Sequence, residues 1–309
     1  MPIGRYAPSP SGDLHVGNLR TGLLAWLFAH ADGGELRLRI DDLDPNVSSG
    51  EYERRQLADL DSIGIGFDGV VLRQSERTDE YRDAIAALIE RGLTYSCFCS
   101  RREVREAAAA PHLHLSEGAY PGTCRDLSES ERGKKSDERP AALRIRAEAV
   151  ELTYVDRVYG EVTGVVDDFV VQRNDGVPSY NLATVLDDAE QRVDEVVRGA
   201  DLVPGTVRQI WLREVLGLPQ TSHAHVPLMM NVAGERLAKR DGAVTIADLS
   251  DRGWSADEVR GLLATSVGLA DIDEVPTPQQ LLARFDPAVV PTEPSTWVDP
   301  PQKASSETV

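Results

Sequence analysis

Apolar side chains in the first hundred residues switch between two periods. Residues 19–27 place Leu and Trp at helical spacing, which predicts a helix that ends at Gly33 and Gly34. Residues 36–40 alternate Leu and Ile with Arg, which is the period of a strand. A further helical stripe covers residues 81–89. This alternation of strand and helix predicts an α/β fold in which helices cover a parallel sheet.

The alternation stops after residue 96. Residues 105–140 are rich in Ala, Ser, Glu, Arg and Pro and show little periodicity, so we interpret them as an insertion. Short strand-like runs follow over residues 143–173, and helical patterning returns from Ser179. The pattern therefore predicts an α/β domain that is interrupted by a differently built segment.

Composition places the chain among soluble globular proteins. Of its 309 residues, 41% are hydrophobic and 27% are charged, which excludes a mainly disordered chain. We expect neither a secretory signal nor a membrane span, because no apolar run approaches about 18 residues. Three cysteines make a poor disulfide framework, so we expect a cytoplasmic protein. No pattern indicates an oligomer, and a monomer is expected.

The charge balance narrows the choice of partners. Asp and Glu outnumber Lys and Arg by 51 to 33, which gives a net charge of −18. Such a protein is repelled by polyanions at long range, which argues against general DNA or RNA binding. A local basic surface still allows one particular nucleic acid to bind. We therefore expect no DNA partner.

Residues 8–18, PSPSGDLHVGN, form the most specific local feature of the chain. They stand at a predicted strand-to-helix junction, where unpaired N–H groups and the positive end of the helix dipole suit a phosphate. Gly12 and Gly17 let a ligand approach the backbone, and His15 can donate a hydrogen bond to a phosphate oxygen. Taken alone, the segment also fits an ordinary capped helix with an incidental histidine.

Residues 5–22 resemble the first signature (HIGH) of the class I aminoacyl-tRNA synthetases, in the form used for glutamate and glutamine. Four further segments are similar to motifs of that family and occur in its order: LRIDDLDP at 38–45, PSYNLATVLDDA at 178–189, VVRGADL at 196–202 and RLAKRDGA at 236–243. The last of these resembles the second signature (KMSKS). The resemblance extends to about residue 270, and five segments in order are hard to attribute to chance.

The resemblance implies a Rossmann-like, parallel-sheet class I synthetase catalytic domain with an inserted zinc-bearing subdomain and a small helical C-terminal part. This agrees with the α/β fold that the periodicity predicts. We expect the first half of the catalytic domain at 1–96, the zinc-bearing insertion and β-rich connection at 97–165, the second half at 166–235, the second-signature loop and helical part at 236–293, and a disordered tail at 294–309.

In this family an amino-acid carboxylate attacks the α-phosphate of ATP and releases pyrophosphate. Negative charge accumulates in that transition state, so the site needs fixed donors and cations rather than a covalent nucleophile. By resemblance, His15 and Lys239 are catalytic, with Mg²⁺ on the phosphates. Taken alone, Lys239 would be an ordinary solvated loop charge. The residues expected to bind ATP are Pro8, Gly12, His15, Gly17, Asn18 and Lys239.

A glutamate site must hold two carboxylates and one ammonium group. Arginine can bind a carboxylate through two parallel hydrogen bonds, which distinguishes glutamate from glutamine. By resemblance, Asp41 would pair with the ammonium, although the family usually has the longer Glu there. Without the resemblance, Tyr180 and Arg198 would be ordinary surface residues. The expected glutamate-binding residues are Arg5, Tyr6, Ala7, Pro8, Ser9, Asp41, Tyr180 and Arg198.

The second signature departs from the family pattern at two positions. Arg236 replaces the first Lys and keeps its charge, whereas Ala238 replaces a Ser and loses a hydroxyl. Because Lys239 is retained, we expect activity.

Three closely placed cysteines predict a metal site, and zinc is favoured because thiolates are soft ligands. A tetrahedral site needs a fourth ligand. From spacing alone, His112 or His114 is the better chemical choice, and a water ligand or the absence of a metal are further alternatives. The resemblance points instead to a tyrosine, and it implies a structural site. The ligands implied are Cys97, Cys99, Tyr120 and Cys124.

Only 69 residues follow Arg240, whereas a full glutamyl-tRNA synthetase carries a longer anticodon-binding region there. This layout resembles a short branch of the family, which activates glutamate without tRNA and attaches it to the queuosine base at the wobble position of tRNA(Asp). We therefore expect ATP, L-glutamate and tRNA(Asp) carrying queuosine as partners. The alternatives are a truncated synthetase that charges a tRNA 3′ end, and a glutamate- or ATP-binding protein with reduced catalysis.

Overall fold

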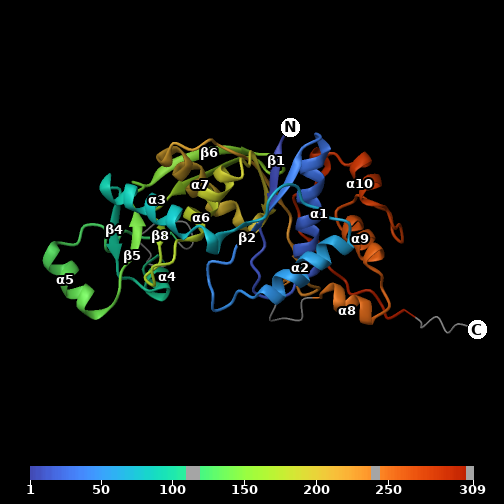
Figure 1. The fold of residues 1–309 in the computed structure, drawn as a ribbon, viewed down its shortest axis with the longest axis horizontal. Coiled ribbons are helices and arrows are strands. Elements are labelled where there is room, and N and C mark those ends of the chain that lie inside the picture. The colour runs from blue at the N-terminus through green and yellow to red at the C-terminus, as the bar shows by residue number, and fades with distance from the viewer. Residues whose placement is uncertain (109–118, 238–243, 304–309) are drawn as a thin grey trace, which may run out of the picture.

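The computed structural model describes residues 1–108, 119–237 and 244–303. Its central sheet contains β1 (Ile3–Tyr6), β2 (Glu35–Ile40), β3 (Leu72–Arg73), β6 (Val150–Asp156), β7 (Gly160–Val166), β9 (Glu195–Gly199) and β10 (Ser222–Val226). Their order across the sheet is β3-β2-β1-β9-β10-β6-β7 (Figure 1). All neighbours pair in parallel except β6 and β7. The predicted α/β fold with a parallel sheet is confirmed.

Helix α1 (Val16–Ala31) lies at the centre of the main core and is buried along most of its length. It packs on β1, β2 and β9 and also contacts α9 (Ala256–Thr265) and α10 (Pro278–Arg284) (Figure 1). Leu23 and Leu27, whose spacing predicts this helix, are completely buried. The helix that carries the first signature is therefore held between the sheet and the C-terminal helices.

A second group of helices covers the other half of the sheet. Helix α7 (Val203–Leu216) packs on β6 and β7, and α6 (Tyr180–Glu190) packs on α7 and on α3 (Thr78–Glu90). The remaining helices outside the small sheet are α2 (Gly50–Ser62), α8 (Ile246–Asp251) and the 3-10 turns η1 (Gln74–Glu76), η2 (Ala200–Leu202) and η3 (Pro287–Val289). No helix in the three described ranges is both long enough and apolar enough to cross a membrane.

A separate three-stranded antiparallel sheet lies at one end of the molecule (Figure 1). It consists of β4 (Thr94–Cys97), β5 (Ala142–Ile145) and β8 (Val170–Gln172), with α4 (Arg101–Ala108) and α5 (Glu129–Glu138) beside it. The expected boundary after residue 96 falls inside β4, and the one after residue 165 falls inside β7. Both boundaries therefore cut strands rather than linkers. In addition, β6 and β7 belong to the central sheet, which β6 joins through β10.

The C-terminal segment packs on the body of the protein. Strand β12 (Ser295–Thr296) pairs in parallel with β11 (Met229–Met230), and the Trp297 side chain is only 7% exposed. The expectation of a disordered tail is therefore wrong for residues 294–303, because burial of the indole offsets the entropy cost of ordering the segment. Residues 304–309 lie outside the described residues.

Candidate active site

A cavity of about 330 Å³ lies where β1, β2, β9 and β10 end. Open α/β sheets bind their ligands at this carboxyl edge. All the residues expected to bind glutamate line the cavity: Arg5, Tyr6, Ala7, Pro8, Ser9, Asp41, Tyr180 and Arg198. Four of the residues expected to bind ATP also line the cavity: Pro8, His15, Gly17 and Asn18. Gly12 is not among the lining residues, and Lys239 lies outside the described residues.

Gln56 of α2 supports the first-signature loop through two hydrogen bonds. The Gln56 amide donates hydrogen bonds to the carbonyl of Ser9 at 3.0 Å and to that of Gly12 at 2.6 Å. Gly12 has a φ of 154°, a conformation that favours glycine. The Gln56 side chain is almost completely buried. Gly12 thus shapes the loop and presents its carbonyl to Gln56, although it does not line the cavity.

His15 is the N-cap of α1. The ring nitrogen Nδ1 of His15 accepts a hydrogen bond from the backbone N–H of Gly17 at 3.1 Å. The backbone N–H of His15 donates to Asn18 Oδ1 at 3.4 Å. Because Nδ1 is an acceptor, the neutral imidazole carries its proton on Nε2. The ring and the N-terminus of α1 therefore present donors at the cavity, the arrangement that suits a phosphate.

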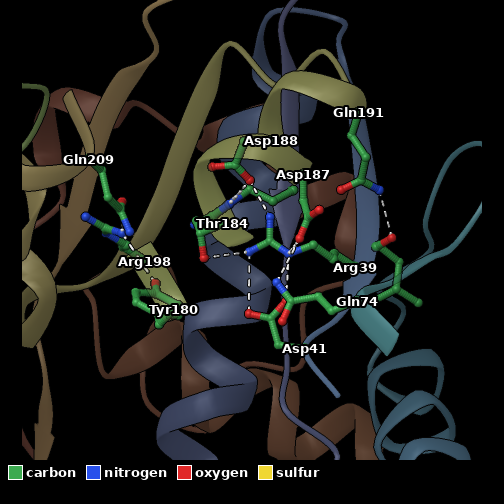
Figure 2. A network of polar contacts seen from close by, with 12 residues as sticks. Arg39, Asp41, Gln74, Tyr180, Thr184, Asp187, Asp188, Gln191, Arg198 and Gln209 are labelled. Atoms are coloured by element: carbon green, nitrogen blue, oxygen red, sulfur yellow. Dashed lines mark hydrogen bonds and ion pairs between the residues drawn. The ribbon is translucent and has the colours of Figure 1, made fainter. Parts of the chain in front are cut away.

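Arg198, near the end of β9, is 4% exposed and lines the cavity. Its Nε donates to His225 Nε2 at 3.1 Å, its Nη1 to Gln209 Oε1 at 2.7 Å, and its Nη2 to Thr206 Oγ1 at 2.8 Å. A longer contact of 3.4 Å joins Nη1 to the Tyr180 hydroxyl (Figure 2). Within the described ranges, no carboxylate forms an ion pair with Arg198. A buried guanidinium surrounded by uncharged groups favours an anionic ligand.

Asp41 is joined to the buried interior by Arg39. Arg39 Nε donates to Asp41 Oδ1 at 2.6 Å, and its Nη1 donates to Asp188 Oδ1 at 2.5 Å (Figure 2). Arg5 Nε lies 3.4 Å from the same Asp188 oxygen, and its Nη1 donates to the carbonyl of Val197 at 2.8 Å. This network fixes the directions of Arg5 and Asp41 at the cavity wall. Asp41 therefore already has one cationic partner in the protein.

Burial and charge act in opposite directions on the two carboxylates of this network. Burial alone would raise the pKa of Asp188, but the guanidinium groups of Arg39, Arg5 and Arg213 outweigh it, and the pKa is lowered. At Asp41 burial dominates, and the pKa is raised despite the contact with Arg39. A cationic ligand beside Asp41 would therefore stabilise its ionised form.

The second-signature segment begins at the cavity, and the chain is next described beside the start of α1. Arg236 Nη1 lies 2.6 Å from Asp201 Oδ2, and both residues line the cavity. Farther along the chain, the carbonyl of Val244 accepts a hydrogen bond from Val16 N at 2.9 Å, which returns the chain to the start of α1. The predicted residues between these points, Ala238 and Lys239, lie outside the described residues.

The cysteine cluster lies at the small sheet, away from the cavity. The three Sγ atoms of Cys97, Cys99 and Cys124 are within 4.8 Å of one another, with 3.6 Å between Cys99 and Cys124. Tetrahedral zinc spaces its sulfur ligands by about 3.8 Å. The Tyr120 hydroxyl lies 3.4 Å from Cys97 Sγ and 3.9 Å from Cys99 Sγ. The four predicted residues are thus together, and three thiols can hold a metal ion.

The neighbours of this cluster hold Tyr120 in place. Arg144 stacks 3.7 Å from the centroid of the Tyr120 ring, and Asp167 Oδ2 accepts from Tyr120 N at 2.8 Å. Burial, and then the neighbouring thiols, raise the pKa of Cys99 to about 12, a shift that a bound cation would oppose. The alternative ligands His112 and His114 lie outside the described residues.

Comparison with known proteins agrees with these motifs. The family described as tRNA synthetases class I (E and Q), catalytic domain, matches residues 3–296. The chain belongs to this family. A curated relative from Nocardia farcinica, named glutamyl-Q tRNA(Asp) synthetase, is 56% identical over 296 residues, which cover 96% of this chain and 92% of the relative. A relative of the same name from Symbiobacterium thermophilum is 44% identical over 308 residues, 95% of each chain.

The fold of this class I synthetase is similar to that of a solved glutamate tRNA ligase. A glutamate tRNA ligase from Elizabethkingia meningosepticum, crystallised in complex with its amino acid, has a TM-score of 0.78 and 25% identity. The similarity covers 96% of this chain and 67% of that chain. The fold class is thereby confirmed, and the chain is a ligase of the class I synthetase type.

Four residues that support the cavity wall were not predicted from the sequence. Gln56 supports the first-signature loop, and His225, Thr206 and Gln209 surround Arg198. The motifs quoted above contain none of the four. The one available signal is polar residues on otherwise buried faces, such as His225 within the buried run of β10.

Proposed function

We propose that this class I synthetase activates L-glutamate with ATP in the absence of tRNA, forms glutamyl adenylate, and transfers glutamate to the queuosine base of tRNA(Asp). Two observations support the proposal. The similar relatives are named glutamyl-Q tRNA(Asp) synthetase and match nearly the whole chain. The cavity has a cationic wall that suits an acidic side chain. The reducing cytoplasm, where tRNA and free thiols coexist, is the proposed location.

The environment of Arg198 is the observation that carries the choice of amino acid. Of its five N–H donors, three point to His225, Gln209 and Thr206 within 3.1 Å. The two donors that remain, one on each Nη, can bind the two oxygens of a glutamate side chain. The Tyr180 contact at 3.4 Å is long enough to yield to the ligand. Glutamine would leave the buried charge without a counter-ion.

The part of the cavity wall at Asp41 would receive the ammonium group of glutamate. Asp41 keeps acceptor capacity beyond its contact with Arg39, since a carboxylate has about four lone-pair positions. Its shorter side chain, compared with the usual Glu, would set the amino group nearer to this wall. We assign Arg5 and Ser9 to the same site, because both line the cavity.

Activation places the glutamate α-carboxylate against the α-phosphate of ATP. A new bond forms between a carboxylate oxygen and phosphorus, and the bond from that phosphorus to the bridging oxygen breaks, which releases pyrophosphate. His15, the N-terminus of α1 and Lys239 would stabilise the growing negative charge, and Mg²⁺ would neutralise the phosphates. In the second step, a nucleophilic group of the queuosine base attacks the carbonyl carbon, and AMP leaves.

We assign zinc to the cysteine cluster, with Cys97, Cys99, Cys124 and Tyr120 as ligands. Three thiolates and a phenolic oxygen fit a closed four-coordinate site. Because none of these residues lines the cavity, the metal would stabilise the small sheet and take no part in activation.

The proposal is tested by ATP–pyrophosphate exchange with purified protein, comparing glutamate, glutamine and aspartate, each with and without tRNA. We expect exchange with glutamate alone and no requirement for tRNA. Arg198→Lys should raise the KM for glutamate about tenfold or more, because Lys cannot bind both oxygens and keep its three protein partners. Arg82→Lys, at an exposed position of α3, is the matched control and should not change it.

A transfer assay then locates the product. We expect labelled glutamate in the anticodon fragment of tRNA(Asp) that carries queuosine, and none in tRNA without it. Label at the 3′ end would support a truncated synthetase instead. An absence of exchange with every amino acid would overturn the proposed activation and favour a binding protein.

A further inference from the structure

We propose that Asp156 and His225 are positioning residues that hold Arg198 in the orientation needed to bind a carboxylate. The inference rests on the proposed function, since it assigns a supporting role at the glutamate site. Neither residue lines the cavity, and they act only through Arg198. Asp156 ends β6 and His225 lies in β10, so two adjacent strands of the central sheet support the binding residue of a third.

The direction of the hydrogen bonds follows from the chemistry of arginine. A guanidinium group has donors only, so the contact of 3.1 Å between Arg198 Nε and His225 Nε2 requires a lone pair on Nε2. The proton of the neutral imidazole must then lie on Nδ1. Asp156 Oδ2 is 2.5 Å from that nitrogen and accepts a hydrogen bond from it. The carboxylate thus selects the single tautomer of His225 that can accept from Arg198.

The burial of the three residues makes this selection stringent. Both the His225 and the Asp156 side chains are completely buried. Two N–H donors that faced each other there could not form hydrogen bonds to water instead. Burial lowers the pKa of His225 despite the neighbouring Asp156, which keeps the imidazole neutral at pH 7. The His223 ring stacks on His225, with 6.1 Å between centroids and 5° between planes, which restricts rotation.

The contact to Nε fixes the plane of the Arg198 guanidinium. Gln209 and Thr206 hold one proton of each Nη, and the bond to His225 anchors the third nitrogen. With all three nitrogens held, one proton on each Nη is left for a ligand, and the one on Nη1 has only the long contact of 3.4 Å with the Tyr180 hydroxyl. If His225 carried its proton on Nε2, that N–H would face the Nε–H of Arg198. The other neighbour of Nε2, the Thr206 hydroxyl at 3.1 Å, already accepts from Arg198 Nη2, so the guanidinium would tilt away from the ligand.

Asp156→Asn tests the inference with almost no change in shape. Oδ1 accepts from the backbone N–H groups of Val158 and Tyr159, and the backbone N–H of His225 lies 3.2 Å from both Oδ1 and Oδ2. The amide oxygen can therefore keep all three backbone contacts while the NH₂ group takes the place of Oδ2. That NH₂ group would donate to His225 Nδ1 and force the proton onto Nε2. We expect the KM for glutamate to rise about tenfold, with the KM for ATP changed less than about twofold.

Glu195→Gln is the matched control. Glu195 is another buried carboxylate, it lies on the same strand as Arg198, and it pairs with Arg157 rather than with the cavity. A purely structural loss would affect both variants alike, whereas the inference predicts a change in the KM for glutamate for Asp156→Asn only.

A second variant separates the tautomer from the carboxylate. In His225→Gln, the amide oxygen can accept from Arg198 Nε without any choice of tautomer. Adding Asp156→Asn to His225→Gln should therefore leave the KM for glutamate unchanged. A further tenfold rise in the double variant would show that Asp156 acts by another route, and it would overturn the inference.

Nitrogen NMR of the histidine side chains reads the tautomer directly, independently of activity. We expect His225 protonated on Nδ1 in the wild type and on Nε2 in Asp156→Asn. A wild-type signal for Nε2–H, or an unchanged KM for glutamate in Asp156→Asn, overturns the inference. A wild type with no glutamate-dependent exchange contradicts the proposed function instead, and the NMR result then still decides the tautomer.

Discussion

At the residue scale, the space between Gly17 and the His15 ring is too small for a side chain. A Cβ atom at Gly17 would lie 3.0 Å from Cε1 and 3.1 Å from Nδ1 of His15. We expect Gly17→Ala to displace the ring and lower kcat for ATP–pyrophosphate exchange about 10- to 100-fold, while the melting temperature stays equal or rises because Ala favours a helix. Steady-state exchange kinetics and thermal unfolding measure the two effects.

Gly50→Ala provides the comparison for this variant. Gly50 begins α2, and a Cβ atom there would contact nothing within 4 Å. Its kcat should equal that of the wild type. If Gly17→Ala also retained full kcat, the position of the His15 ring would not matter for activation.

Asp59 gives the stability a pH dependence. Burial, and then the Asp13 carboxylate, raise the pKa of Asp59 to about 6. A carboxyl group whose pKa is higher in the folded state costs stability as pH rises, here between about pH 4 and 6. Because Asp59 is partly exposed, we take the cost at neutral pH as about 1 kcal/mol. Asp59→Asn should therefore raise the melting temperature at pH 8 more than at pH 4.5.

Asp61→Asn, which changes an exposed carboxylate on the same helix, should shift the melting temperature equally at both pH values. A uniform shift in Asp59→Asn as well would contradict the raised pKa. Differential scanning calorimetry in the two buffers measures both variants.

Sequence motifs predicted the residues that face the cavity but not those that support them. Arg198 and Asp41 belong to segments that resemble family motifs, so a place at the site could be predicted for both, and both line the cavity. His225 and Gln56 act through contacts with residues 27 and 44 or more positions away, and no local pattern carries that information. Supporting residues of a buried site depend on tertiary packing, which a single sequence does not display.

At the element scale, the short pairing of β11 and β12 connects the C-terminal segment to the cavity wall. Trp297 N donates to the carbonyl of Met230 at 2.7 Å, and its indole lies in the main core. We expect Trp297→Ala to lower the free energy of unfolding by about 3 kcal/mol, because it leaves a large cavity. Chemical denaturation with the neighbouring Val298→Ala, which changes an exposed side chain, gives the reference. Equal losses in both variants would argue against the packed indole.

Helices and strands with a periodic pattern of apolar residues could be predicted from the sequence. Strands that form only because they pair with a distant strand could not. The apolar spacing of residues 19–27 predicts α1, and the alternation of residues 36–40 predicts β2. In contrast, β12 has two residues and no periodicity, so the segment was expected to be disordered. The residues of β6 were recognised as strand-like, but with those of β7 they were placed in the insertion and β-rich connection at 97–165. The reason is that β10, the strand through which β6 joins the central sheet, follows more than fifty residues later.

At the scale of the whole molecule, the small sheet beside which the cysteine cluster lies and the C-terminal helices α9 and α10 are at opposite ends (Figure 1). None of the residues that line the cavity belongs to the small sheet. We expect one zinc ion per chain by elemental analysis, and Cys124→Ser should lose it. The exchange activity should persist within about twofold, because no ligand of the cluster lines the cavity. Resistance to proteolysis should fall mainly in the small sheet.

Ser128→Ala distinguishes loss of metal from local loosening. Ser128 caps α5 beside the small sheet, and removing the cap should destabilise that helix by about 1 kcal/mol. The zinc content of this variant should equal that of the wild type. Loss of exchange in Cys124→Ser with intact exchange in Ser128→Ala would assign the metal a role in activation and contradict a purely structural site.

The pairing of β11 with β12 also has a consequence for biosynthesis. Met229 forms part of the cavity wall, but its strand partner, Ser295, is translated 66 residues later. At roughly 5–20 residues per second, the ribosome needs about 3–13 s to cover that distance, before any delay in the exit tunnel. During that interval the nascent chain has most of the sheet but an unfinished pocket. Completion of this part of the cavity wall therefore waits for a segment that leaves the ribosome much later than β11.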